Sequence, residues 1–130
     1  MYYIHYMAQV LIVEDDSFIS LFLERKLKEI GHIVYTAAKT SEAETILNKQ
    51  TAVDIILLDL ILPDESGFDF LARLKKSAHK DIPVLILSNL GQEHEMERGK
   101  QLGAIDFLVK GNLSPNEIAD HVDTVLKKGV

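Results

Sequence analysis

Residues 53–67, with the sequence VDIILLDLILPDESG, decide how the rest of the chain is arranged. Residues 55–58 are apolar without polar alternation, which is typical of a strand buried on both faces of a sheet. Asp59 follows this strand, and residues 63–67 combine proline, acids, serine and glycine, which indicates a loop before the next helix. In open α/β sheets, ligands bind at the carboxyl ends of the strands, so Asp59 is a candidate for chemistry. A single aspartate at such a position is more often a solvated residue that ends the strand. Whether Asp59 has a chemical role therefore depends on which residues follow the other strands.

The composition is that of one globular domain. The 130 residues are 47% hydrophobic and 26% charged, and they include no cysteine, which excludes disulfides, thiolate zinc sites and cysteine nucleophiles. A net charge of -6 argues against nucleic-acid binding through a basic patch, so protein partners are expected. The aromatic start lacks the pattern of a signal peptide or membrane span. We expect residues 1–7 to be an N-terminal extension and residues 8–130 to be the domain.

Apolar runs and helical spacings alternate along the chain. We expect strands at residues 10–13, 33–35, 55–58, 83–87 and 105–109. The first helix is expected to start at Asp16 or Ser17 and end at Gly31, with its apolar residues at Phe18, Ile19, Phe22, Leu23, Leu27 and Ile30.

The other helices have their own start signals. Ser41 and Glu44 have capping-box spacing, which predicts a second helix through about Lys49. A third helix is expected at residues 67–77, and a last one begins with Ser114, Pro115 and Glu117. Residues 92–102 are so polar that their helix should be the least firmly packed, and Gly99 weakens it by about 1 kcal/mol.

This alternation predicts an α/β fold, with a doubly wound sheet of five parallel strands and helices on both faces. Right-handed crossovers leave few strand orders. One known order for such sheets, 2-1-3-4-5, is the one we expect by analogy; it would place the first and third strands side by side at the point where the order reverses.

Chemically useful side chains stand at the expected carboxyl ends of four strands: Glu14, Asp15, Asp59, Ser88 and Lys110. Converging carboxylates need a counter-charge, and hard oxygen ligands suit Mg²⁺ or Mn²⁺. Lys110 and a metal would neutralise a transferring phosphoryl group, for which Asp59 is a competent nucleophile. Asp16 is better interpreted as a helix cap. The five histidines are scattered in polar surroundings, and we interpret none as a metal ligand.

Four segments, LIVEDD (residues 11–16), LLDLILPDESG (57–67), LILSN (85–89) and FLVKG (107–111), together resemble the receiver domain of two-component response regulators over about residues 8–128. The resemblance implies a flavodoxin-like (βα)5 fold and a cytoplasmic signalling switch, not a conventional enzyme. It implies that Asp59 accepts a phosphoryl group from a sensor histidine kinase or a histidine phosphotransfer protein. It also implies Mg²⁺ bound by Asp15, Asp59 and the Ile61 backbone carbonyl, with Glu14 acting through water, Mn²⁺ as a substitute, and Ser88 and Lys110 contacting phosphoryl oxygens.

The resemblance further implies a conformational switch. In the family, the residue matching Ser88 moves toward the phosphate and an aromatic residue follows it inward, and Phe107 occupies that place. The fourth helix, fifth strand and fifth helix would then repack to control an effector protein or a C-terminal output domain. A homodimer through that face stays open, and neither direct nucleic-acid binding nor membrane binding is expected.

The chain departs from the usual receiver pattern at Gly111, and it has apolar residues at positions 61 and 90. Gly111 stands where the family usually has a cis proline, so the approach of Lys110 is expected to be less rigid. Ile61 and Leu90, two residues beyond Asp59 and Ser88, are both apolar. We predict that they shield the acyl phosphate from water and slow its hydrolysis.

Other classes of protein share parts of this pattern. A degenerate receiver could bind a partner without phosphorylation, and Gly111 keeps that alternative open. An aspartyl-phosphate phosphatase of the haloacid dehalogenase type would need an acid at position 61, where Ile61 stands. A nucleotide-binding flavodoxin-like protein is disfavoured because no strand is followed by a glycine-rich loop. The chain could also be a fragment of a longer regulator.

Overall fold

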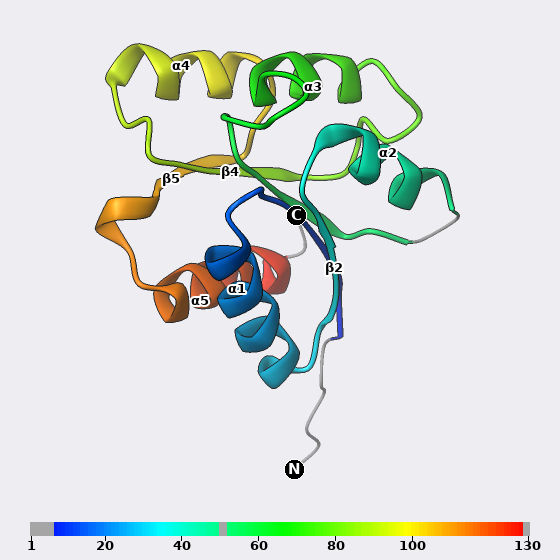
Figure 1. The fold of residues 1–130 in the computed structure, drawn as a ribbon, viewed down its shortest axis with the longest axis vertical. Coiled ribbons are helices and arrows are strands. Elements are labelled where there is room, and N and C mark those ends of the chain that lie inside the picture. The colour runs from blue at the N-terminus through cyan, green and yellow to red at the C-terminus, as the bar shows by residue number, and fades with distance from the viewer. Residues whose placement is uncertain (1–6, 50–51, 129–130) are drawn as a thin grey trace.

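Five parallel strands form the central sheet of the computed structural model, which describes residues 7–49 and 52–128 (Figure 1). The strands are β1 (Gln9–Val13), β2 (Ile33–Ala37), β3 (Ile55–Leu58), β4 (Val84–Ser88) and β5 (Asp106–Val109). Their order is β2-β1-β3-β4-β5, which confirms the predicted doubly wound α/β fold. Residues 1–6 of the expected N-terminal extension lie outside the described residues.

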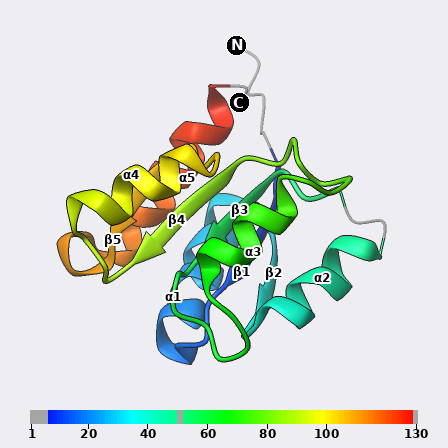
Figure 2. The ribbon, with the colours of Figure 1, turned by 90° about the horizontal axis from the view of Figure 1, so that it is seen from above.

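Helices cover both faces of the sheet (Figures 1 and 2). On one face lie α1 (Ser17–Ile30) and α5 (Pro115–Lys127), which pack against each other. On the other lie α2 (Thr40–Asn48), α3 (Gly67–Leu74) and α4 (Glu93–Gln101). Within residues 7–49 and 52–128, no helix is both long enough and apolar enough to cross a bilayer.

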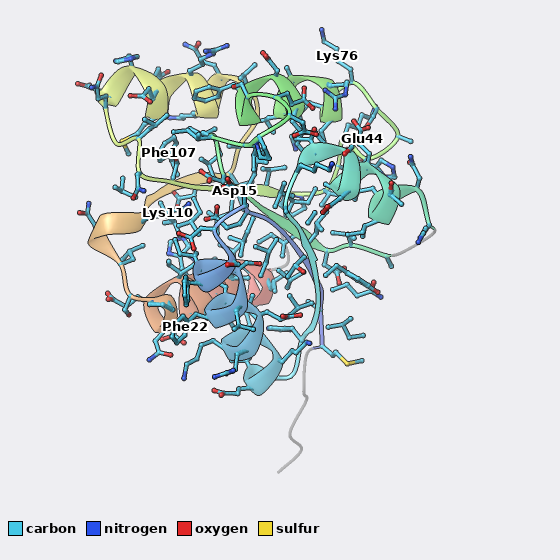
Figure 3. All side chains as sticks on the ribbon, in the orientation of Figure 1. Asp15, Phe22, Glu44, Lys76, Phe107 and Lys110 are labelled. Carbon is cyan, nitrogen blue, oxygen red and sulfur yellow. The ribbon has the colours of Figure 1, made fainter. Side chains whose placement is uncertain are left out.

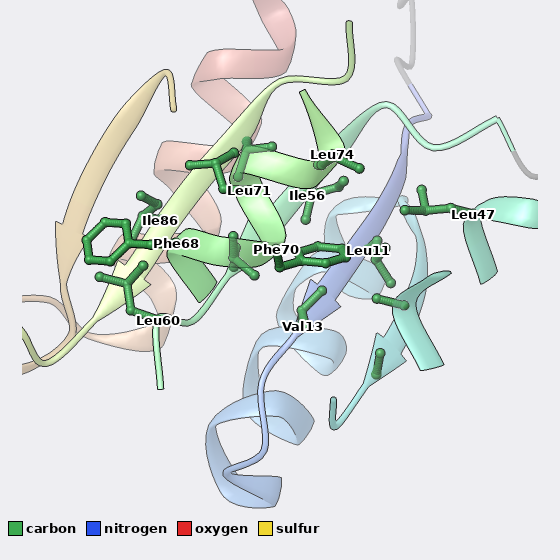
Figure 4. Packing of buried hydrophobic residues seen from close by; sticks show 14 of the residues in the cluster. Leu11, Val13, Leu47, Ile56, Leu60, Phe68, Phe70, Leu71, Leu74 and Ile86 are labelled. Carbon is green, nitrogen blue, oxygen red and sulfur yellow. The ribbon is translucent and has the colours of Figure 1, made fainter. Parts of the chain in front are cut away.

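The sheet separates two apolar clusters. Leu11 and Val13 of β1 point toward α2 and α3, whereas Val10 and Ile12 point toward α1 and α5. The same alternation occurs in β3, and Figure 4 shows Phe70 of α3 packed beside Leu11 and Val13. Because both faces are buried, these strands need apolar residues at every position, which explains their unbroken apolar runs.

The ends of α1 and α5 follow the sequence signals. The Asp16 side chain accepts hydrogen bonds from the N–H groups of Phe18 (3.0 Å) and Ile19 (3.3 Å). Gly31 ends α1 with a φ of 113°, a left-handed conformation that favours glycine. At α5, Ser114 and Glu117 form the predicted capping box. Both helix starts were therefore correctly predicted.

The predicted start of α2 is wrong. The helix begins at Thr40 after Lys39, which contributes no side-chain cap, so Ser41 lies inside the first turn. The acceptor is instead the carboxylate of Asp64, from the loop after β3. A tertiary contact therefore replaces the local cap.

Other helical details also differ from the expectation. The third helix ends at Leu74 instead of residue 77. Phe18 is 75% exposed and Phe22 is half exposed, because the apolar stripe of α1 is wider than the face that packs on the sheet. Gly99 is buried, and a Cβ added there would lie 2.7 Å from Ile86 Cδ1. The glycine therefore allows α4 to pack close to β4, although it lowers helix propensity.

Candidate functional site

Three carboxylates meet at the carboxyl ends of β1 and β3. The two strands are adjacent and parallel, with Val13 in register with Leu58, so the residues that follow them are neighbours. One oxygen from each of Glu14, Asp15 and Asp59 lies within 4.8 Å of the others. Glu14 is 4% exposed and Asp59 is 6% exposed, whereas Asp15 is exposed to solvent. The predicted acidic cluster is therefore present.

Lys110 brings the counter-charge to this cluster. It follows β5 and begins a short 3-10 turn, η1 (Lys110–Asn112). Its ammonium group forms an ion pair with Glu14 Oε1 and lies 3.2 Å from Asp59 Oδ2. Figure 3 shows Asp15 and Lys110 at the same end of the sheet. The residues that follow β1, β3 and β5 thus meet at one end of the sheet, next to the point where the strand order 2-1-3-4-5 reverses.

Burial and proximity change the protonation of the cluster. Burial, followed by the nearby Asp59 carboxyl group, raises the pKa of Glu14 from 4.5 to about 7, and Lys110 opposes that rise. Burial acts to lower the pKa of Lys110, but the ion pairs with Glu14 and Asp59 outweigh it and raise the pKa. Lys110 therefore remains a cation at neutral pH, and the Glu14 carboxyl group keeps its proton to a higher pH than an ordinary glutamate.

The donor set fits a divalent metal ion. Its ligands would all be oxygen atoms, the kind that Mg²⁺ and Mn²⁺ prefer. The buried Glu14 Oε1 accepts no well-formed hydrogen bond within the described residues, although the Lys110 ammonium group contacts it. Such an oxygen has capacity left for a metal-bound water.

Ile61 and Ser88 complete the rim of an open pocket, lined also by Glu14, Asp15, Asp16, Asp59, Asn89 and Lys110. Ser88 is fully buried at the end of β4, and its hydroxyl accepts a hydrogen bond from the Leu90 N–H at 3.3 Å. Ile61 is 60% exposed, and its N–H donates to Asp59 Oδ1 at 3.4 Å. Asp16, the α1 cap, shares this rim.

Phe107 and Leu90 lie outside this pocket lining. Phe107 of β5 is buried in the apolar cluster beneath α3 and α4, and Figure 3 shows it below α4. It is in register with Ile86 of β4. Leu90 is partly buried against the same cluster. Their predicted roles in switching and shielding therefore remain predictions.

Gly111 has no special backbone conformation. No cis peptide bond occurs in residues 7–49 and 52–128, and Gly111 is not among the glycines there with positive φ. A Cβ added to it would meet no atom within 4 Å. The ion pairs with Glu14 and Asp59 orient the Lys110 ammonium group in the absence of the usual proline.

Sequence reasoning missed Gly67 as a residue of this site. A Cβ added to Gly67 would lie 2.7 Å from Leu60 Cα and closer still to the Asp59 carbonyl oxygen. The Gly67 N–H also donates to the Leu60 carbonyl at 2.8 Å. The glycine therefore permits the start of α3 to pack against the backbone that carries Asp59. The sequence signal was its position at the end of the loop, which was interpreted only as punctuation.

His32 has a structural role that the sequence does not indicate. Its side chain is buried. Nδ1 accepts a hydrogen bond from the Ala8 N–H at 3.0 Å, and Nε2 lies 3.0 Å from Asp123 Oδ1. These bonds join the start of β1 to α5, and they lie outside the acidic pocket.

Comparison with known proteins agrees with this geometry. The family model described as the response regulator receiver domain matches residues 10–123. The transcriptional regulatory protein CusR of Escherichia coli is 36% identical over 121 residues, which cover 93% of this chain and 52% of CusR. The probable transcriptional regulator ycf27 of Guillardia theta is 32% identical over 120 residues, which cover 92% of this chain and 46% of that protein. The chain thus spans about half the length of these relatives.

Solved structures show the same fold. The receiver domain of the Francisella response regulator 1452 matches with a TM-score of 0.84 and 29% sequence identity, covering 95% of this chain and 99% of that domain. The sheet order, the acidic cluster and the family match lead to one conclusion. The chain belongs to the response regulator receiver domain family.

Proposed function

We propose that this receiver domain accepts a phosphoryl group on Asp59 from a phosphohistidine of a sensor kinase or phosphotransfer protein. The observation that carries this proposal is the buried Asp59 carboxylate, which lies beside Glu14 and Asp15 with Lys110 Nζ 3.2 Å from its Oδ2. A carboxylate nucleophile and fixed positive charge are what phosphoryl transfer requires.

In the transfer step, an Asp59 carboxylate oxygen attacks phosphorus. The new O–P bond forms as the P–N bond to the donor imidazole breaks. The imidazole keeps the electron pair of that bond and, because its other ring nitrogen carries a proton, leaves as neutral histidine. Lys110 stabilises the charge on the phosphoryl oxygens, and Ser88 donates a hydroxyl hydrogen bond to one of them. The cluster would hold Mg²⁺, or Mn²⁺, through Asp15, Asp59 and the Ile61 carbonyl, with Glu14 acting through water. Bound metal supplies further positive charge to the phosphoryl oxygens.

Phosphorylation would then bias a conformational change. The acyl phosphate adds negative charge and three acceptor oxygens, toward which Ser88 and Lys110 close. A Cβ at Gly99 of α4 would lie 2.7 Å from Ile86 Cδ1 and 3.5 Å from Phe107 Cδ2, so β4, β5 and α4 are in direct contact. Among the described residues of α4, only Gly99 is buried, so the helix itself contributes little apolar surface to the core. The α4, β5 and α5 face is a suitable output surface for this reason.

The partners follow from this cycle. A histidine kinase or phosphotransfer protein supplies the phosphoryl group. The α4, β5 and α5 face then acts on an effector protein, on an output domain beyond this chain, or on a second copy. Because the chain spans about half of its relatives CusR and ycf27, each of these partners is a proposal.

The decisive test is the intact mass after incubation with phosphoramidate or acetyl phosphate, with and without Mg²⁺. We expect the wild-type chain to gain one phosphoryl group only with Mg²⁺, and Asp59→Asn to gain none, because the amide is not a nucleophile. A wild-type chain that gains no mass under any condition would contradict the proposal and favour a receiver that binds its partner without phosphorylation.

The affinity for Mg²⁺ is expected to rise with pH and to level off above about 7. The pKa of Glu14 is raised from 4.5 to about 7, mainly by burial, so its proton must leave before the carboxylate can act on the cation. Without metal, the raised pKa of Glu14 means that the folded chain binds this proton more tightly than the unfolded chain does. The resulting stabilisation of the folded state is fully present below pH 4.5 and is lost as the pH rises through about 7. Calorimetric titration with Mg²⁺ between pH 5.5 and 8 measures the trend. Glu14→Gln should flatten it, and a wild-type affinity independent of pH would refute this prediction.

Apolar residues two positions beyond Asp59 and Ser88 should prolong the phosphorylated state. We expect the double variant Ile61→Asn, Leu90→Glu to hydrolyse its acyl phosphate about tenfold faster, because polar side chains can orient an attacking water. The decay of the phosphorylated mass gives the lifetime. Since Ile61 lines the pocket and Leu90 does not, the single Ile61→Asn variant should account for most of the change. An unchanged lifetime in the double variant would exclude shielding.

A further inference from the structure

The loop between β3 and α3 is tied to the start of α2. Lys39 leaves the first N–H groups of α2 without a local side-chain acceptor. Asp64 provides two: its Oδ1 accepts from the Thr40 N–H at 3.0 Å, and its Oδ2 accepts from the Ser41 N–H at 3.1 Å. The hydrogen bonds outweigh the opposing effect of desolvation and lower the pKa of Asp64 to about 2. The carboxylate is therefore ionised, and it caps α2 from a distant loop, at neutral pH.

A second tie runs through the next residue, Glu65. The two Glu65 carboxylate oxygens accept bidentate hydrogen bonds from Arg73 of α3, each 2.7 Å long. The same guanidinium group pairs with Glu44 of α2. The buried Thr40 hydroxyl lies 2.6 Å from Glu65 Oε1 and 2.9 Å from Asp64 Oδ2, so it can donate its proton to either. These bonds join the loop to both helices, which lie side by side on one face of the sheet (Figure 2).

Both ties act at the tip of a closed loop. Ile61 and Ser66 form an antiparallel bridge at its base, with Asp64 and Glu65 between them. Ile61 also lines the pocket around Asp59. Holding the tip against α2 therefore limits how far the Ile61 backbone can move relative to the carboxylates.

We propose that Asp64 is a positioning residue for the cation site: by capping α2 from this loop, it holds the Ile61 backbone in place. Asp64 is not among the residues that line the pocket, so it acts through the loop and not by contact. This inference rests on the proposed function because it takes the Ile61 backbone carbonyl to be a ligand of the cation. Loss of a residue that orients a metal ligand commonly weakens metal binding by 10- to 100-fold. Because the tie through Glu65 remains, we expect a loss of about tenfold in Asp64→Ala.

The test needs a variant that loses a helix cap of the same kind elsewhere. Ser114→Ala serves, because the Ser114 hydroxyl caps α5 on the opposite face of the sheet by accepting from the Glu117 N–H at 3.2 Å. Asp64→Asn is the conservative variant, since its amide oxygen can still accept from one N–H group. Equilibrium titration of the amide NMR spectrum with Mg²⁺, in the absence of any phosphodonor, gives the dissociation constant of each variant.

Hydrogen exchange gives a second readout that needs no metal. The Gly67 N–H, bonded to the Leu60 carbonyl, reports on the loop, and the Ile56 N–H, bonded to the Pro83 carbonyl, reports on the sheet. In Asp64→Ala we expect the protection of Gly67 to fall about tenfold more than that of Ile56. In Ser114→Ala the two amides should change equally, and the Mg²⁺ affinity should remain that of the wild type.

The outcomes separate the two proposals. Weaker Mg²⁺ binding and selective exposure of Gly67 in Asp64→Ala, with partial recovery in Asp64→Asn, support the positioning role. A wild-type chain that binds Mg²⁺, with an Asp64→Ala variant that binds it equally well, overturns the positioning role alone. A wild-type chain without a saturable Mg²⁺ response overturns the proposed function as well.

Discussion

Gly67→Ala is expected to destabilise the fold by about 3 kcal/mol, the upper part of the range for overpacking. An alanine at an ordinary helix position would be stabilising relative to glycine. Here the added methyl group would meet Leu60 Cα at 2.7 Å and the Asp59 carbonyl oxygen at a shorter distance. These are backbone atoms at the end of a central strand, so relief of the clash must move either that strand end or the start of α3.

Urea denaturation with and without Mg²⁺ measures this effect. Gly111→Ala is the matched control, because a Cβ at Gly111 meets no atom within 4 Å. The control should be neutral or stabilising by up to about 1 kcal/mol. Since the clash falls on Asp59, the proposed phosphoryl acceptor, Gly67→Ala should also be phosphorylated more slowly under conditions where it remains folded. A Gly67→Ala variant as stable as Gly111→Ala would refute the prediction.

Lys110→Gln is expected to slow the phosphorylation of Asp59 by about 100- to 1,000-fold, the usual cost of removing one group that stabilises transition-state charge. The Lys110 side chain is only 10% exposed, and its ammonium group pairs with both Glu14 and Asp59. Glutamine keeps a hydrogen-bond donor at this position but removes the positive charge. Initial rates of mass gain with phosphoramidate at saturating Mg²⁺ give the factor.

The same variant should change stability in a pH-dependent way. Without metal, loss of the ammonium group leaves two buried carboxyl groups together, and about 3 kcal/mol of stability should be lost at pH 8. The loss should be smaller at pH 5, because the pKa of Glu14 is raised to about 7 and its protonated form needs no counter-charge. Lys76→Gln is the control and should change neither rate nor stability, because Lys76 is exposed and lies well away from Lys110 in Figure 3. Phosphorylation of Lys110→Gln at the wild-type rate would show that this charge is not used.

Sequence patterns predicted which residues gather at this end of the sheet, because these residues follow strands. A strand buried on both faces is visible as an apolar run, and the residue after the run marks its carboxyl end. Once the strand order is known, Glu14, Asp15, Asp59, Ser88 and Lys110 must gather at one end of the sheet. The caps of α1 and α5 were likewise readable, because Asp16 and Ser114 bond to N–H groups two or three residues away.

Tertiary structure alone decided the contacts between segments distant in sequence. The cap of α2 comes from Asp64, 24 positions after Thr40, and no local spacing announces it. The burial of His32 depends on Asp123 of α5, and the close approach that requires Gly67 depends on the angle at which α3 leaves its loop. The exposure of Phe18 follows from which part of the apolar stripe of α1 meets the sheet.

The division has a physical reason. Local periodicity and the handedness of crossovers depend on the covalent chain, so the apolar runs determined the doubly wound sheet and the placement of its acids. Hydrogen-bond partners, burial and pKa depend on which surfaces meet after the chain has folded. The sequence by itself therefore determined that acids and a lysine would meet at the end of this sheet. Only the tertiary structure decided that Lys110 pairs with Glu14 as well as Asp59, and that Asp64 anchors the loop beside them.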